Sequence, residues 1–201
     1  MLNPFASGLT LLKGHFLRLE QLREDHFEDL ARAAADERIW QYLAADGSTS
    51  QGFNSWFAST LELQHQRNLV AFAVILDKTN KSIGSTGFKN ISIPHCRVGL
   101  GTTWLNPQFW GTGANSELTY LVLRYLFEDL SINRCEVRIH CGNSRNRNFM
   151  KTIGMVHEGI LRQNWQGRGE QAVDLAVGSI LSAEWPEVAS KLLERLRQSV
   201  S

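Results

Sequence analysis

The loop at residues 108–115, which reads QFWGTGAN, combines residue types and spacing that suit the binding of a phosphorylated ligand. Gly111 and Gly113 carry no side chain that would keep a ligand away from the backbone amides. An apolar helical stripe follows, so the loop enters a helix at the positive end of its dipole, where free N–H groups bind phosphate. The same glycines also suit a tight strand-to-helix turn that binds nothing, and the loop alone leaves both interpretations open.

Two familiar nucleotide-binding motifs do not fit this loop. A P-loop needs Gly-Lys-Ser/Thr at a fixed distance, and that tripeptide is absent. A dinucleotide-binding loop needs a third glycine, where this chain has Ser116, and an acidic residue after the next strand, where it has His140. A nucleotide-binding protein that uses this loop for phosphate is therefore a disfavoured alternative.

Composition restricts the remaining function classes. The chain has 201 residues, is 43% hydrophobic and balances 21 Lys and Arg against 20 Asp and Glu that alternate along it, so we expect no nucleic-acid partner. No apolar run approaches the ~20 residues that span a bilayer, which favours a cytoplasmic protein without a membrane partner. Cys96, Cys135 and Cys141 are odd in number and lack metal-ligand spacing, so we expect reduced thiols and no metal.

Hydrophobic periodicity predicts the elements that position the loop. A strand at 15–19 precedes a helix around 27–34, a second helix lies within 51–67, and strands at 69–76 and 82–88 form a hairpin. A strand at 98–105 then leads into the loop and a helix that carries Leu118, Leu121, Val122, Tyr125 and Leu126. A strand at 135–139, a short helix that ends at Gly154, strands at 155–165 and 171–181 and a closing helix complete the chain.

Several motifs together resemble the GCN5-related N-acetyltransferase (GNAT) superfamily. Gln108, Gly111 and Gly113 match its Q/R-x-x-G-x-G/A signature. Asn143 with Gly154 eleven positions on, the run from Glu158 to Arg162, and Asp174, residues 179–181 and Trp185 look like its ribosomal-protein N-acetyltransferase (RimJ/RimL-type) branch. The resemblance implies an α/β (α+β) acyl-CoA N-acyltransferase fold: one domain over residues 1–201 with its core at about 15–198, and a mixed, mostly antiparallel sheet of about seven strands with splayed central strands, flanked by helices.

The resemblance also implies the cofactor and the residues around it. Acetyl-CoA is the expected cofactor, with its pyrophosphate on the loop and its pantetheine arm between the splayed strands. The residues that this arrangement assigns to the cofactor are Trp104, Leu105, Asn106, Gln108, Trp110, Gly111, Thr112, Gly113, Ala114, Asn115 and Asn143. The side chain of Asn143 also suits an N-cap for the helix that follows, so its role stays open.

The implied reaction is acetyl transfer from the CoA thioester to a primary amine, and it needs a proton acceptor and a donor. Here the chain departs from its relatives. Residues 98–103 contain no acid, Met150 stands where other branches have a proton-donor tyrosine, and Asn146 replaces a common serine. The catalytic candidates are Asn146, which can hydrogen-bond a sulfur atom, and His140, which has a suitable ordinary pKa but also suits a pocket wall.

The acceptor site is the least readable part of the sequence. Trp40, His95, Trp165 and Asp174 are candidates for acceptor binding, with core packing as the alternative for the two tryptophans and a salt bridge with Arg162 or Arg168 as the alternative for Asp174. The acceptor is expected to be the N-terminal amine of a (ribosomal) protein, or else a small amine such as a polyamine, antibiotic or amino acid. A CoA-binding module without turnover remains a further alternative, and a homodimer is compatible with such a fold.

Overall fold

The computed structural model describes residues 11–167 and 172–200, and a single sheet runs through this part of the chain. Its strands are β1 (Leu11–Lys13), β2 (Leu17–Gln21), β3 (Leu69–Leu76), β4 (Lys81–Ser92), β5 (Arg97–Leu105), β6 (Arg134–His140), β7 (Val156–Gln166) and β8 (Ala172–Leu181). They lie in the order β1-β2-β3-β4-β5-β6-β8-β7, eight among the described residues where about seven were expected. Every neighbouring pair is antiparallel except β5 and β6, which confirms the predicted mixed sheet.

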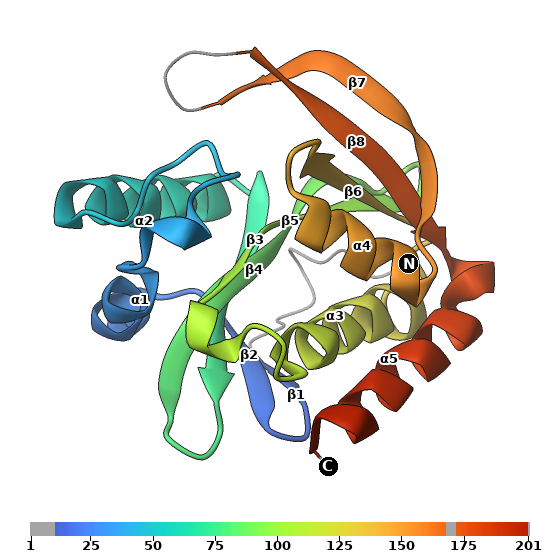
Figure 1. Cartoon of the computed structure of the whole chain (residues 1–201), viewed down its shortest axis with the longest axis horizontal. Helices are drawn as coiled ribbons and strands as arrows, with labels where there is room; N and C mark the ends of the chain where they lie inside the picture. The colour runs from blue at the N-terminus through green and yellow to red at the C-terminus, as the bar shows by residue number, and fades with distance from the viewer. Residues whose placement is uncertain (1–10, 168–171, 201) are drawn as a thin grey trace.

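Helices cover both faces of this sheet (Figure 1). The helices α1 (Phe27–Ala34) and α2 (Ser50–His65) pack on one face, and α3 (Ala114–Arg124), α4 (Ser144–Ile153) and α5 (Trp185–Val200) pack on the other. Strand β3 is buried on both sides, because Val70, Phe72 and Val74 face α3 while the alternate residues of the strand face α1 and α2. None of the described helices is long and apolar enough to cross a membrane.

The predicted elements agree with these bounds at most positions. The predicted strand 69–76 coincides with β3, and the turn after it uses Asn80 at φ 56°, a left-handed conformation that asparagine tolerates. The predicted strand 82–88 was too short, because β4 continues to Ser92 along β5. Helix α3 ends in a π-helical turn, Tyr125–Asp129, that the apolar stripe did not reveal. The second half of the turn predicted at 166–169 and the first residue of the strand predicted at 171–181 lie outside the described residues.

The parallel pair β5 and β6 separates partway along its length. The two strands pair over four residues, from Arg97 opposite Arg134 to Leu100 opposite Val137. Beyond that point β5 continues along β4 to Leu105, and β6 continues along β8 to His140. Thr102 adopts φ 54° at an irregularity in the β4–β5 ladder, so β5 bends where the pairing with β6 stops. The splayed central strands implied by the resemblance are present.

A buried carboxylate joins the first turn of α3 to the start of β2. Glu117 is 2% exposed, and its side chain accepts hydrogen bonds from the backbone N–H groups of His15, Phe16 (3.2 Å) and Leu17 (3.0 Å). Burial raises the pKa of the Glu117 carboxyl, and the three backbone donors act in the opposite direction. This contact fixes the first turn of α3, and with it the glycine loop, against the sheet.

Glu117→Gln is expected to destabilise the fold by about 2–4 kcal/mol, because the new amide group turns an N–H donor toward backbone donors that lose their acceptor. Urea unfolding at neutral pH measures this change. Glu128→Gln is the matched control, since Glu128 accepts one indole N–H, from Trp185 (2.7 Å), and is expected to cost about 1 kcal/mol. An equal loss of unfolding free energy in the two variants would contradict the larger contribution expected from the three hydrogen bonds to Glu117.

Candidate active site

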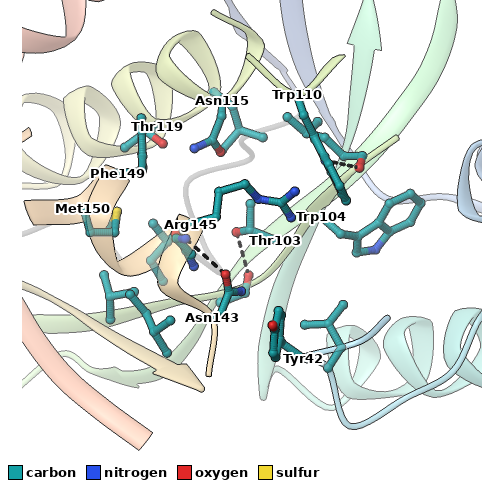
Figure 2. Close-up of a pocket in the computed structure, with 18 of the residues that line it drawn as sticks. Tyr42, Thr103, Trp104, Trp110, Asn115, Thr119, Asn143, Arg145, Phe149 and Met150 are labelled. Carbon is teal, nitrogen blue, oxygen red and sulfur yellow. Dashed lines mark hydrogen bonds between the residues drawn. The ribbon is translucent and has the colours of Figure 1, made fainter. Parts of the chain in front are cut away.

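The divergence of β5 and β6 opens a cavity of about 890 Å³. Its walls come from β5 and β6, the loop at 108–113, α3, α4 and α5, and the segment at 38–45 that precedes α2, with single residues from β4 and β7. Figure 2 shows Thr119, Phe149 and Met150 at one end and Tyr42 and Trp104 at the other, with Arg145 between them. One continuous cavity therefore runs from the glycine loop to the aromatic residues beside α2.

The glycine loop has the geometry of an anion site. Gly111 and Gly113 have φ 80° and 81°, and a Cβ added to Gly111 would meet nothing within 4 Å, so open space lies beside it. Gly113 is the N-cap of α3 and has no side chain to accept from the helix. The N–H groups of residues 114–116 have no hydrogen-bond acceptor within the described ranges. The loop therefore offers free donors at the positive end of α3.

The loop residues predicted to bind the cofactor divide into two groups. Trp110, Gly111, Gly113 and Asn115 line the cavity. Gln108, Thr112 and Ala114 do not line it: the Thr112 hydroxyl donates to the Phe109 carbonyl (2.8 Å), and Ala114 is fully buried in the core.

The end of β5 presents backbone groups to the gap. The N–H of Asn106 donates to the Ile83 carbonyl of β4 (2.8 Å), so strand alternation directs the N–H of Leu105 to the opposite side, toward the gap. Trp104 and Leu105 both line the cavity. Asn106 does not, because its side chain donates to the Ala33 carbonyl and accepts from the Gln108 N–H, both at 3.0 Å. Asn106 therefore holds the loop to α1.

Asn143 is a helix cap whose amide donor remains available. Its Oδ1 accepts the backbone N–H of Asn146 at 3.1 Å, which caps α4. Its Nδ2 has no partner among the described residues, and the residue lines the cavity. The two roles weighed for Asn143 are therefore compatible, since the cap uses the oxygen and leaves the N–H donors.

Two arginines that the sequence reading missed also line the cavity. The guanidinium of Arg145 lies 3.4 Å from the ring centroid of Trp110, and Figure 2 shows it reaching across the cavity from α4. Burial, together with the nearby Arg38, lowers the pKa of Arg145. Arg195 of α5 lies beside Phe149 with its Nε buried and unpaired. Helical spacing gave a signal for Arg195 only, because it is three residues after the buried Leu192, whereas Arg145 lies two residues after Asn143 and shares no helix face with it.

The two catalytic candidates both line the cavity. His140 accepts the Gly142 N–H at its Nδ1 (2.9 Å), and its ring lies 5.2 Å from the ring of Tyr42. A neutral imidazole in this arrangement carries its hydrogen on Nε2, so that nitrogen is a hydrogen-bond donor and not a proton acceptor. Asn146 contributes an amide, which donates a hydrogen bond but does not release a proton.

No aspartate or glutamate of the described residues lines the cavity. The absence of acid noted for residues 98–103 therefore extends to all of the described wall. The charged side chains that line the cavity are instead cationic: Arg38, Lys89, Arg138, Arg145 and Arg195. The described residues also contain no group of three or more His, Cys, Asp and Glu that is placed to hold a metal.

The four residues predicted for the acceptor site lie in different environments. Trp165 lines the cavity, as does Trp40, which is fully buried and donates to the Ala34 carbonyl (2.8 Å). Trp40 supports the cavity wall from behind, with its ring centroid 5.5 Å from that of Trp104. His95 is exposed in the turn between β4 and β5, away from the cavity. Asp174 accepts the Gln163 N–H (2.8 Å) where β7 bulges, which is a structural role.

Comparison with known proteins finds an acetyltransferase (GNAT) domain over residues 17–156. An N-acetyltransferase of Bacillus licheniformis, p20, is 29% identical over 125 residues, which are 62% of this chain and 68% of that protein. A Bacillus subtilis (strain 168) protein, YdaF, whose name presents it as a candidate ribosomal N-acetyltransferase, is 30% identical over 82 residues, 41% of this chain and 44% of its own.

Solved structures share the fold. A GCN5-related N-acetyltransferase from Brucella melitensis is 25% identical, with a TM-score of 0.84 over 92% of this chain and 84% of its own. Mycobacterium smegmatis RimJ, solved in complex with CoA-disulfide, is 17% identical, with a TM-score of 0.74 over 89% of this chain and 88% of its own. At that identity the second likeness concerns the fold alone.

Asn143→Asp separates the capping role of this residue from ligand binding. Aspartate caps as well as asparagine, so the free energy of unfolding is expected to change by less than about 0.5 kcal/mol. The variant loses the amide donor and adds a negative charge, so the dissociation constant for acetyl-CoA is expected to rise about tenfold or more. Urea unfolding and calorimetric titration measure the two effects. If the variant binds acetyl-CoA as tightly as the unmodified protein does, Asn143 acts only as the N-cap of α4.

Proposed function

Since this chain belongs to the acetyltransferase (GNAT) family and is an acyl-CoA-dependent N-acetyltransferase, we propose that it acetylates the N-terminal amine of a protein. The observation that supports this proposal most directly is that one cavity joins the glycine loop to the aromatic residues beside α2. The acetyl donor and the acceptor amine can therefore meet in the same space. The name of YdaF supports a protein acceptor, and membership of the acetyltransferase (GNAT) family supports a CoA donor.

We assign the cofactor to the wall that runs from Leu105 to Asn115. Acetyl-CoA, when bound, supplies an activated thioester. The free N–H groups at the start of α3 and the open space beside Gly111 fit its pyrophosphate. The gap-facing N–H of Leu105 and the free Nδ2 of Asn143 suit the amides of the pantetheine arm. Arg145 and Arg195 supply positive charge for the phosphates.

The residues near the acceptor act by orienting the amine, without a carboxylate base. A primary amine reacts in its neutral form, and no described carboxylate lines the cavity to take its proton. The Nδ1 of His140 is already bonded to Gly142. We infer that the amine enters neutral or loses its proton to water, and that Trp104, Trp165 and Tyr42 exclude bulk water from the reacting atoms.

The cofactor assignment is tested by thermal unfolding. At a concentration 100 times its dissociation constant, acetyl-CoA stabilises by about 2.7 kcal/mol, which raises Tm by roughly 5–10 °C for a chain of this size. Gly111→Asp is expected to abolish this shift, because its carboxylate lies at the free amides. Gly111→Asn is the isosteric control, since asparagine tolerates the same positive φ without charge. An unchanged Tm for the unmodified protein, or equal shifts in both variants, would count against the assignment.

Turnover is tested by release of CoA thiol with peptides and with small amines. Peptides with a free N-terminal amine are expected to react, and the same peptides blocked at that amine are not. With no enzyme base, kcat/KM is expected to rise tenfold per pH unit until the pKa of the acceptor ammonium, about 8 for an N-terminus and about 10.4 for a lysine-like amine. If kcat/KM instead levels off at the same pH for both acceptors, a base on the enzyme takes the proton. Reaction of small amines alone would overturn the proposal of a protein acceptor.

A further inference from the structure

Lys89 is a half-buried cation on the wall of the cavity, and the sequence reading gave it no role. It lies on β4 opposite Gly99 of β5, and its Nζ would be 2.9 Å from a Cβ added to Gly101. The end of the Lys89 side chain therefore occupies the space over β5 that Gly101 leaves empty, next to the point where β5 and β6 separate. Within the described ranges Lys89 forms no ion pair.

The neighbouring charges explain why Lys89 has no partner. Arg138 of β6 pairs with Glu136 at 2.7 Å, and Arg134 pairs with the same Glu136 at 3.3 Å and with Glu158. Both carboxylates on this face are thus already bonded to arginines. Burial, and then the charge of Arg138, lower the pKa of Lys89. A half-buried ammonium beside another cation is unfavourable unless an anion joins it.

The phosphates assigned to the glycine loop lie too far along β5 to serve as that anion. Leu105 is four positions beyond Gly101, which at about 3.3 Å per residue is roughly 13 Å along the strand, and the loop begins beyond Leu105. Arg145 and Arg195 are already available on the loop side of the cavity. Lys89 therefore faces the part of the cavity that remains for the acceptor.

We propose that the acceptor carries a carboxylate, and that this carboxylate pairs with Lys89 while the amine lies further along β5, toward Leu105. This inference rests on the proposed function of the site. The strand spacing places the two groups of the acceptor several bonds apart, roughly 7–13 Å. The acidic side chain of a peptide beside its N-terminal residue meets this requirement, and so does a long ω-amino acid.

The test compares acceptors that differ only in this charge. One pair is Ser-Glu-Ala amide and Ser-Gln-Ala amide, and the other is 6-aminohexanoate and 6-aminohexanamide. With acetyl-CoA in excess, kcat/KM from thiol release is expected to favour the carboxylate by about tenfold or more in at least one pair. The pair that shows the preference identifies the source of the carboxylate, a peptide side chain or a small amino acid.

Lys89→Met is expected to reduce this ratio to about one. Lys78→Met is the matched control: Lys78 is exposed in the turn between β3 and β4, away from the cavity, and its variant is expected to keep the ratio. Thermal unfolding checks that both variants fold. A ratio near one in the unmodified protein for both pairs, or an unchanged ratio in Lys89→Met, would overturn the proposal.

A binding measurement keeps this inference separate from the transferase activity. Protein saturated with CoA is titrated with each tripeptide amide by calorimetry, which needs no turnover. An affinity about tenfold higher for the glutamate peptide, lost in Lys89→Met, supports the pairing even if no tested acceptor is acetylated. Equal affinities for the two peptides would contradict it even if both are acetylated.

Discussion

The separation of β5 from β6 is the constraint on which the site depends. Adjacent parallel strands normally satisfy each other's backbone groups along their length, but here the pairing ends at Leu100 and Val137. Strand β5 keeps β4 as its neighbour, and β6 keeps β8, so each remains held on its outer side. The inner side of β5 is left with backbone donors that face a cavity instead of a strand. A ligand with amides of its own is the natural partner for such an edge.

The surrounding elements hold this separation open. Core residues on the two faces of the sheet fix β3, β4 and β5 between α1 and α2 on one side and α3 on the other. Glu117 ties the first turn of α3 to β2, and Asn106 ties the start of the loop to α1. The loop is therefore anchored at both ends by residues that do not line the cavity. Its free amides are held in position before any ligand arrives, which lowers the ordering cost of binding.

The charges around the cavity are unevenly matched. Carboxylates on the β6 face are bonded to Arg134 and Arg138, whereas Lys89 and Arg145 have no carboxylate partner in the described part of the chain. A cavity of this kind favours anionic ligands over cationic ones, because each unpaired cation gains most from a desolvated anion. The same charge pattern disfavours an ammonium ion, which is consistent with an acceptor amine that reacts in its neutral form. The unpaired cations of the cavity thus suit the phosphates of the acetyl donor and a carboxylate on the acceptor.

The sequence by itself determined the order and type of the elements, the glycine loop at the start of α3 and the family. Apolar periodicity is a local property, so β3, α1 and the stripe of α3 were readable from it, and the loop motif depends on consecutive residues. Only the tertiary structure decided which side chains meet. It showed that Asn106 bonds to the backbone of the distant α1 and Asp174 to the backbone of the neighbouring strand β7, that Nδ1 of His140 is occupied, and that His95 lies outside the cavity. It also brought Lys89, Arg145 and Arg195 into one cavity, because contacts between residues far apart in sequence follow from how the sheet splays and how the helices pack on it, and no local pattern encodes that.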